Sequence, residues 1–247
     1  MYHVSVPALH GIVTALVTPF RDDERIDCSA WQTLIDAQVA AGVNGLFVGG
    51  STGEFFAQDL EERTVALRFV RQAAGSRVPV YGNVGCVTTR ETVRLALAAQ
   101  GEGIDVLAVV TPYYLRPSQA ELADHYIEIC RAVNVPVLAY NFPRHGGVEI
   151  LPDTLARIAR VCPNLAGIKD SSGAIERLSG YLEAAPPRQF AVFIGPEKLA
   201  TAGLKMGCTG VVSGSANVVP RLFVDFYRAF REGRMETAAH LQSLVDE

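Results

Sequence analysis

Short apolar runs alternate with longer amphipathic segments along the whole chain, at a spacing of roughly 25 to 30 residues. The runs are of strand length, and their nearly continuous apolar character indicates burial on both faces, as in a parallel sheet. The pattern predicts eight strands, at Ile12–Leu16, Gly45–Val48, Pro79–Gly82, Asp105–Val110, Pro136–Tyr140, Leu165–Lys169, Ala191–Ile194 and Thr209–Val212.

Helix signals lie between these strands. Asp27 and Gly42 bound the first helix, Ser118 caps the fourth, and Pro152 and Pro220 begin two later ones. Eight strand–helix units with right-handed crossovers close most simply into a single (β/α)8 TIM barrel. A doubly wound open sheet is the alternative, but the glycine fingerprint GxGxxG that usually follows its first strand is missing.

Composition supports one large domain and argues against several kinds of partner and ligand. The chain has 247 residues, 49% of them hydrophobic, and a net charge of −4 without a basic block, so neither nucleic acid nor an anionic membrane is expected as a partner. No apolar run is long enough to span a membrane and no signal peptide is visible, which favours the cytoplasm. The five cysteines and five histidines are scattered, so we expect reduced thiols, no metal site and no cofactor.

Lys169 is the first candidate for chemistry. Only three of the 22 basic residues are lysines, and this one ends an apolar strand in the stretch LAGIKDSSG. A partly desolvated amine gives up its proton more readily and becomes a nucleophile for a carbonyl carbon. The alternative is a purely structural lysine, paired with Asp170 or reaching toward solvent.

Barrel enzymes place their reacting groups at the carboxyl ends of the strands. The ends here carry Thr18, Ser51, Thr52, Asn83, Tyr113, Tyr114, Tyr140, Lys169, Gly195 and Ser213–Ser215. Glycosidase chemistry lacks its pair of carboxylates, metal-assisted aldol chemistry lacks histidines, and a serine nucleophile has only His145 near it. What fits is an imine on Lys169, a tyrosine that moves protons, and hydroxyls with backbone N–H groups that hold a carboxylate. A phosphate site at Gly195 and SGSAN is a rival use of the last two loops, although Pro196 removes one N–H donor there.

Five motifs carry a specific resemblance: GSTGE from Gly50, TPYY from Thr111, YNFP from Tyr140, GIKDSSG from Gly167 and GVVSGSANVVP from Gly210, after an early TPF. Their order and spacing resemble the dihydrodipicolinate synthase / N-acetylneuraminate lyase family over nearly the whole chain. The resemblance implies a class I, Schiff-base lyase or aldolase that uses pyruvate and an aldehyde, or releases pyruvate from a 2-oxo acid. It also implies a homotetramer built as a dimer of dimers.

The resemblance assigns roles by position. Lys169 would form the imine, Tyr140 would move protons at the imine and at the acceptor oxygen, and Ser51 would link Tyr140 to Tyr114 of a neighbouring subunit. Thr52 would hold the carboxylate of pyruvate through its backbone N–H. The expected substrate-binding set is Thr52, Gly50, His145, Ser171, Gly195, Ser213 and Ser215.

His145 is the departure that bears on the acceptor. Family members that make dihydrodipicolinate carry an arginine two residues after the proline of YN-x-P, where it meets the acceptor's carboxylate; here that place is His145, and Arg144 is one residue early. A mostly neutral imidazole does not reproduce a bidentate arginine. The sequence therefore favours an aldolase for 2-keto-3-deoxy sugar acids. The alternatives are a true 4-hydroxy-tetrahydrodipicolinate synthase of lysine biosynthesis and a non-catalytic barrel that binds a 2-oxo acid.

Two further expectations follow from the resemblance. Phe55, Phe56 and Leu60 stand where lysine-inhibited relatives place polar residues, and apolar side chains do not pair with the charges of lysine, so no feedback inhibition by lysine is expected. The barrel is expected to cover residues 1–233. Residues 234–247 would start a C-terminal helical tail shorter than is usual in the family.

Overall fold

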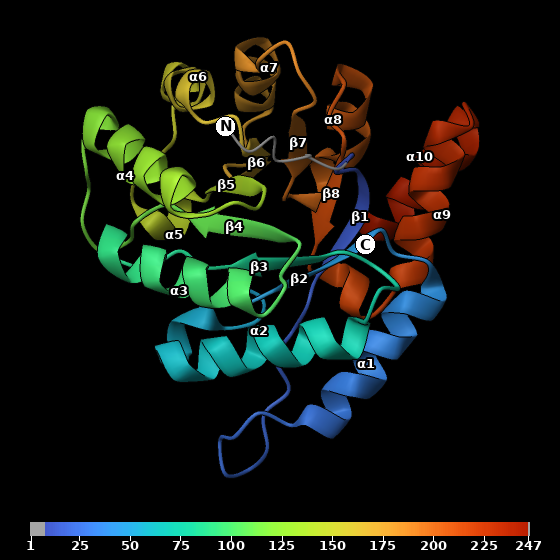
Figure 1. Ribbon diagram of the computed structural model, residues 1–247. Helices are drawn as coiled ribbons and strands as arrows, with labels where there is room; N and C mark the ends of the chain where they lie inside the picture. Colours follow the sequence, from blue (N-terminus) through green and yellow to red (C-terminus); the bar gives the residue numbers. More distant parts are fainter. Residues whose placement is uncertain (1–7, 247) are drawn as a thin grey trace.

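The computed structural model describes residues 8–246 and contains eight parallel strands that close into a barrel in the order β1 to β8 (Figure 1). Each strand pairs with the next one, and β8 pairs with β1. The (β/α)8 fold expected from the sequence is confirmed. The strands are β1 (Gly11–Ala15), β2 (Gly45–Val48), β3 (Val80–Asn83), β4 (Val106–Val110), β5 (Val137–Asn141), β6 (Leu165–Asp170), β7 (Ala191–Ile194) and β8 (Gly210–Ser213).

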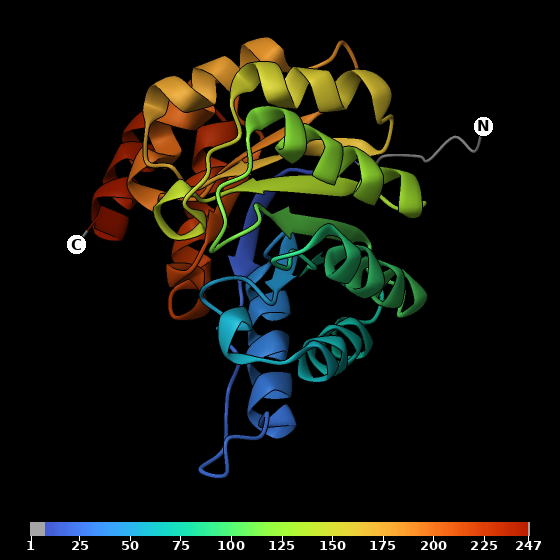
Figure 2. The same cartoon turned by 90° about the vertical axis from the view of Figure 1, so that its left-hand side faces the viewer.

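All helices except the single turn α5 form the outer layer of the molecule, around the strands (Figure 2). The helices are α1 (Cys28–Ala41), α2 (Leu60–Ala74), α3 (Thr89–Gly101), α4 (Gln119–Ala132), α5 (Pro143–Gly146), α6 (Pro152–Val161), α7 (Ile175–Ala184), α8 (Ala200–Met206), α9 (Pro220–Arg231) and α10 (Met235–Asp246). Short 3₁₀ turns are η1 (Phe55–Ala57), η2 (Glu197–Leu199) and η3 (Ser215–Asn217). Within the part of the chain that the structure describes, no helix is long and apolar enough to cross a membrane.

The expected helix boundaries rest on real caps. Asp27 accepts from the backbone N–H groups of Ser29 and Ala30, and Gly42 ends α1 at a φ of 88°. Ser118 forms a capping box with Glu121 at the start of α4. The strand boundaries differ from expectation by one residue in several places, because apolar character alone does not tell where ladder pairing ends. In particular, β6 continues past Lys169 to Asp170.

Two apolar cores hold the barrel together. The outer core lies between strands and helices and contains Trp31, Ile35 and Tyr126. The inner core fills the barrel with rings from β2, β3, β5 and β7, and Tyr81 meets Phe193 edge to face with 6.1 Å between ring centroids. The barrel interior is therefore packed with side chains and is not a pore.

Glycines allow two strand pairs to approach closely. A Cβ at Gly210 would lie 2.2 Å from the carbonyl oxygen of Gly11, where β8 closes onto β1. A Cβ at Gly167 would lie 2.3 Å from the carbonyl oxygen of Ala191 in the neighbouring β7. Both contacts are with backbone, which cannot move aside without opening the sheet. Closure and the position of Lys169, two residues after Gly167, therefore depend on these glycines.

Candidate active site

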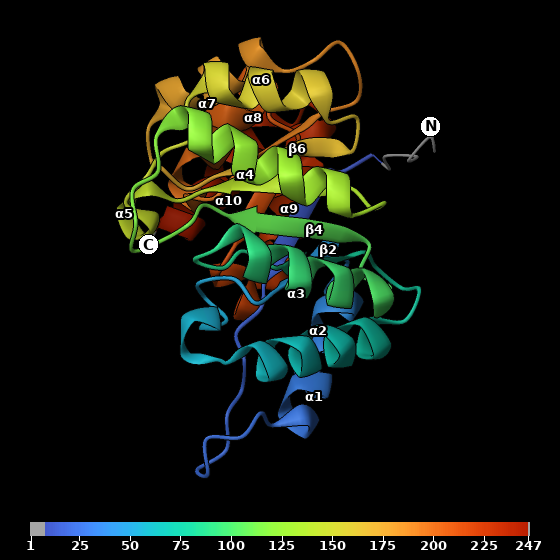
Figure 3. The same ribbon diagram turned by 60° about the vertical axis from the view of Figure 1, so that its left-hand side comes forward.

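A cavity of about 480 Å³, here called the lysine cavity, contains Lys169 and lies at the carboxyl ends of the strands. The loops after β2, β5, β6, β7 and β8 all contribute to its wall. Figure 3 shows α5, which follows β5, at the end of the barrel toward which the β4 arrow points. This is the end at which barrel enzymes carry out chemistry.

Lys169 and Tyr140 form the centre of the lysine cavity. They are direct register partners in the β5–β6 ladder, so their side chains leave the sheet on the same face. The amine of Lys169 lies 4.1 Å from the centroid of the Tyr140 ring and 4.5 Å from that of Phe47. Lys169 is only 4% exposed. The structure thus places a buried amine against two aromatic faces, rather than in a salt bridge with Asp170.

Ser51 brings the loop after β2 to Tyr140. Its hydroxyl oxygen lies 3.2 Å from the phenolic oxygen of Tyr140. The backbone of this loop is itself held by hydrogen bonds. The hydroxyl of Thr18 and the side-chain amide of Gln58 both donate to the carbonyl oxygen of Gly53, at 2.7 and 2.9 Å. A buried polar cluster therefore sets the position of the hydroxyl that meets the tyrosine.

Asp170 anchors the loops next to Lys169 from the other face of the sheet. It accepts hydrogen bonds from the side-chain amide of Asn141 and the hydroxyl of Ser172, each at 2.7 Å. Asn141 in turn accepts from the backbone N–H of Ile150 at 2.9 Å, at the far end of the loop that contains α5. Burial raises the pKa of Asp170 above its usual value, against the lowering effect of these two hydrogen bonds.

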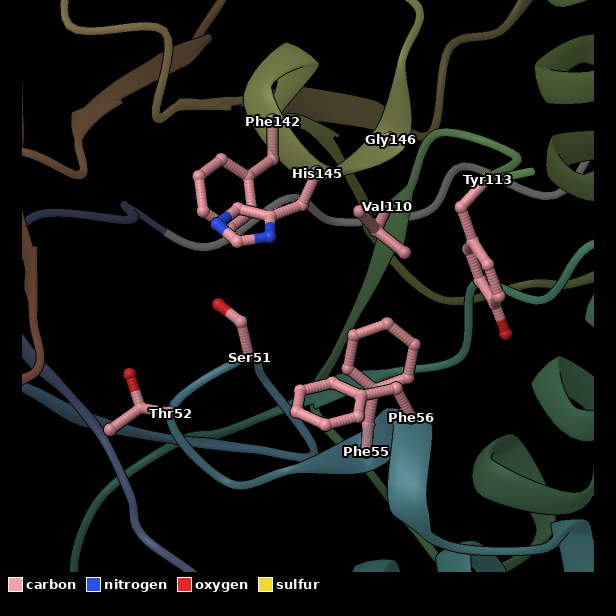
Figure 4. Close-up of a pocket in the computed structure, with 9 residues that line it drawn as sticks. All are labelled: Ser51, Thr52, Phe55, Phe56, Val110, Tyr113, Phe142, His145 and Gly146. Atoms are coloured by element: carbon pink, nitrogen blue, oxygen red, sulfur yellow. The ribbon is translucent and has the colours of Figure 1, made fainter. Parts of the chain in front are cut away.

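A second cavity of about 480 Å³, here called the aromatic cavity, shares Ser51, Thr52, Phe142 and His145 with the first. Figure 4 shows Phe142 and His145 facing Ser51 and Thr52 across open space, with Phe55, Phe56 and Tyr113 to one side. The rings of Phe142 and His145 are 4.5 Å apart between centroids. The two cavities are therefore neighbours with one common wall.

Most of the residues expected from the sequence meet at the lysine cavity, but some do not. Those that line it are Ser51, Thr52, Tyr140, His145, Lys169, Ser171 and Gly195. Gly50, Ser213 and Ser215 are adjacent in sequence to residues that line the cavity but are not themselves part of its wall. The hydroxyls of both serines donate to Glu197 instead, at 2.5 and 2.8 Å.

Tyr114 projects away from its own chain. Its side chain is 93% exposed, and its backbone adopts a φ of 75°, a left-handed conformation that is uncommon for a bulky residue. Tyr114 lines neither the lysine cavity nor the aromatic cavity. Within this chain, the hydroxyl of Ser51 therefore pairs with Tyr140 and not with Tyr114.

The charges around the lysine cavity are of one sign. Among the described residues of its wall, the basic ones are Arg144, Lys169 and Lys198, and none is a carboxylate. Sequence reasoning did not single out Lys198, although the scarcity of lysine that pointed to Lys169 applies to it equally. Within residues 8–246 no group of three metal-binding side chains comes together. The cavity is therefore suited to anionic organic molecules.

This arrangement supports imine chemistry. A buried amine can attack a carbonyl carbon, the adjacent phenol can exchange protons with the intermediate, and the basic wall can hold carboxylates. The aromatic faces exclude water from the amine, which strengthens electrostatic interactions in the cavity.

Comparison with known proteins points in the same direction. Residues 8–246 match the model of the dihydrodipicolinate synthetase family. The chain is 38% identical to a protein of Chelativorans sp. (strain BNC1), over 94% of this chain and 79% of that one. It is 36% identical to a protein of Methylococcus capsulatus, over 93% and 78% of the two chains. Both relatives are named 4-hydroxy-tetrahydrodipicolinate synthase.

Solved structures are similarly close. Dihydrodipicolinate synthase from Aquifex aeolicus superposes with a TM-score of 0.93 at 31% identity, covering 96% of this chain and 80% of that one. YagE, a prophage protein of the dihydrodipicolinic acid synthase family from E. coli K12, was solved in complex with pyruvate. It also superposes with a TM-score of 0.93, at 32% identity and the same coverage.

Replacing Tyr140 tests the role of the phenol at the centre of the site. Tyr140→Phe keeps the ring against Lys169 and removes only the hydroxyl, so we expect imine formation with pyruvate to slow by roughly 10²-fold or more, the usual contribution of a proton-transfer group. Stopped-flow absorbance or rapid-quench mass spectrometry measures that rate. Ser51→Ala, which leaves the phenol in place, should cost only about tenfold, on the order of one hydrogen bond. An unchanged rate in Tyr140→Phe would contradict this assignment.

Proposed function

The chain belongs to the dihydrodipicolinate synthetase family, whose members are class I, pyruvate-dependent lyases, and on that basis we propose that it condenses pyruvate with an aldehyde that carries a carboxylate, as a 4-hydroxy-tetrahydrodipicolinate synthase. The observation that carries this proposal is the buried pair of Lys169 and Tyr140 at the carboxyl ends of β6 and β5. The names of the relatives favour this reading over the sugar-acid aldolase that His145 suggested.

In the proposed reaction, the amine of Lys169 attacks the 2-oxo carbon of pyruvate and loses water to form an imine. Loss of a proton from the methyl group then gives an enamine, whose carbon attacks the aldehyde. The amino group of the acceptor finally attacks the imine carbon, which closes the ring and releases the amine of Lys169. Tyr140, backed by Ser51, moves the protons at the imine and at the new alkoxide. Thr52 at the common wall would hold the carboxylate of pyruvate and orient its carbonyl toward the amine.

Arg144 and Lys198 are the proposed partners of the acceptor's carboxylate. They reach the lysine cavity from the loops after β5 and β7, respectively. From the sequence alone, an arginine one residue early either takes over the contact through a loop adjustment or points elsewhere. Residues 143–146 form a single helical turn, and Arg144 and His145 both line the cavity, so the shift by one residue does not take Arg144 out of the cavity wall.

Tyr114 supports an oligomeric enzyme. A strained backbone at an exposed aromatic residue persists where function or assembly requires it, and Phe56 and Leu115 are also strongly exposed, at 67% and 61%. We propose that Tyr114 enters the site of a second copy and meets Ser51 there, in a dimer that pairs into a tetramer.

Trapping of the imine tests the reaction class. Borohydride reduction in the presence of pyruvate should add the mass of a reduced pyruvate adduct at Lys169, located by peptide mass spectrometry. Lys169→Arg keeps the charge but supplies no comparable nucleophile, so it should remain unmodified. Lys198 lines the same cavity and serves as the internal control for non-specific reduction. An unmodified Lys169 in the wild-type chain would favour a barrel that only binds a 2-oxo acid.

Acceptor choice is tested with two aldehydes. With pyruvate, kcat/KM for aspartate semialdehyde should exceed that for glyceraldehyde by more than about tenfold, because only the former offers a carboxylate to Arg144 and Lys198. Arg144→Ala should lower kcat/KM for aspartate semialdehyde by roughly ten- to a hundredfold and leave glyceraldehyde nearly unaffected. Arg160→Ala, at an exposed arginine of α6, is the matched control. A preference for glyceraldehyde would instead support an aldolase for 2-keto-3-deoxy sugar acids.

The assembly is tested by sedimentation velocity. The wild-type chain should sediment as a tetramer. Tyr114→Ala should reduce the rate of condensation, because the partner's Ser51 then lacks the phenol of Tyr114 as a hydrogen-bond partner. A wild-type chain that stays monomeric while fully active would refute the shared site.

A further inference from the structure

Glu197 places a carboxylate between the loops after β7 and β8. Its Oε1 atom accepts from the hydroxyl of Ser213 at 2.5 Å and the backbone N–H of Ser215 at 2.8 Å, and its Oε2 atom accepts from the hydroxyl of Ser215 at 2.8 Å. Three donors thus converge on one internal anion. In many barrels the loops after strands seven and eight hold the phosphate of a substrate, and these are the donors such a phosphate would need.

Glu197 is held on two sides, at its carboxylate and at its backbone carbonyl. The hydroxyl oxygen of Ser213 also accepts from the backbone N–H of Ala216 at 2.9 Å, so its proton is directed at Glu197. On the other side, the side-chain amide of Gln242 in α10 donates to the carbonyl oxygen of Glu197 at 3.3 Å. The amide oxygen of Gln242 accepts from the backbone N–H and the hydroxyl of Thr201, at 3.2 and 3.1 Å. Glu197 is therefore a fixed part of the fold and not a mobile surface group.

Glu197 lies directly behind the wall of the lysine cavity. Its neighbours in sequence, Pro196 and Lys198, line that cavity, and so does Gly214 between the two serines. A Cβ built on Gly214 would lie 3.3 Å from the hydroxyl oxygen of Thr52, which shows how close this loop comes to the residue proposed to hold pyruvate. The donors around Glu197 lie behind the cavity wall and are already paired with its carboxylate, so a phosphate that approached this corner of the cavity would find a charge of its own sign and no free donor.

The geometry points to Glu197 as a specificity-determining residue: its carboxylate fills the barrel's phosphate site from within, and the enzyme thereby rejects phosphorylated aldehydes. This inference rests on the proposed function only in that the lysine cavity accepts an aldehyde. A carboxylate on the acceptor is unaffected, because Arg144 and Lys198 face the cavity itself. This role differs from simple stabilisation of the loop. If Glu197 only stabilised the loop, its removal would make the loop less ordered, whereas here its removal creates an anion site.

Binding of inorganic phosphate tests this without any reaction. By isothermal titration calorimetry, Glu197→Ala should bind phosphate at least about tenfold more tightly than the wild-type chain, as expected when one or two hydrogen bonds to a charged ligand become available. Glu128→Ala removes an equal charge from the exposed face of α4 and should leave phosphate binding at the wild-type level. Equal phosphate affinity in Glu197→Ala and the wild-type chain would overturn the inference.

Turnover gives the second measurement. With pyruvate, the ratio of kcat/KM for glyceraldehyde 3-phosphate to that for glyceraldehyde should rise by about tenfold in Glu197→Ala. Glu197→Gln keeps the volume and removes only the charge, so it should fold even if the alanine variant does not, and the ratio should rise by a smaller amount. If both variants lose activity toward the two aldehydes equally, Glu197 only stabilises the loop and the inference fails. A wild-type chain that forms no imine with pyruvate would refute the proposed function, whereas the phosphate titration would still decide the role of Glu197.

Discussion

The parallel pairing of β5 with β6 is the constraint on which the site depends. It sets Tyr140 opposite Lys169 and Asn141 opposite Asp170. Because side chains alternate across a strand, the first pair faces the barrel interior and the second faces the outer layer. A slip of one residue would bury the carboxylate among the inner rings and turn the amine outward. One ladder thus fixes both the Lys169–Tyr140 pair and the network that holds the surrounding loops.

The environment of Lys169 combines low polarity with a positive field. Phe47 and Tyr140 cover the amine, and the nearest carboxylate in sequence, Asp170, is engaged with Asn141 and Ser172 on the other face. The amine is thus shielded from water, and the wall around it also carries Arg144 and Lys198. The same cationic wall attracts the anions on which such an amine acts.

Local patterns were enough to predict the architecture, because each strand and cap is specified within a few residues. Asp27, Gly42 and Ser118 do what their positions indicated. Lys169 and Tyr140 were also predictable, since strand ends converge in any barrel. The pairing of Ser213 and Ser215 with Glu197 was not predictable, because Glu197 comes from another loop. The exposure of Arg144 to the cavity depends on the short helix α5, for which the sequence offered no cap beyond Pro143. A single sequence does not show which residues of distant loops contact one another, so these pairings could not be predicted.

The link from Asn141 to Ile150 has an evolutionary consequence. The loop that contains α5 is tied at its base by a buried amide, on the side of the sheet that faces away from Lys169. The residues at its tip can therefore be exchanged, lengthened or shortened while the strand ends stay where the chemistry needs them. In this layout the strand ends stay fixed while the residues at the tip of the loop are free to vary. A barrel with this layout can change which molecules its cavity admits by substitutions in one loop, while the strand ends that carry Lys169 and Tyr140 stay in place.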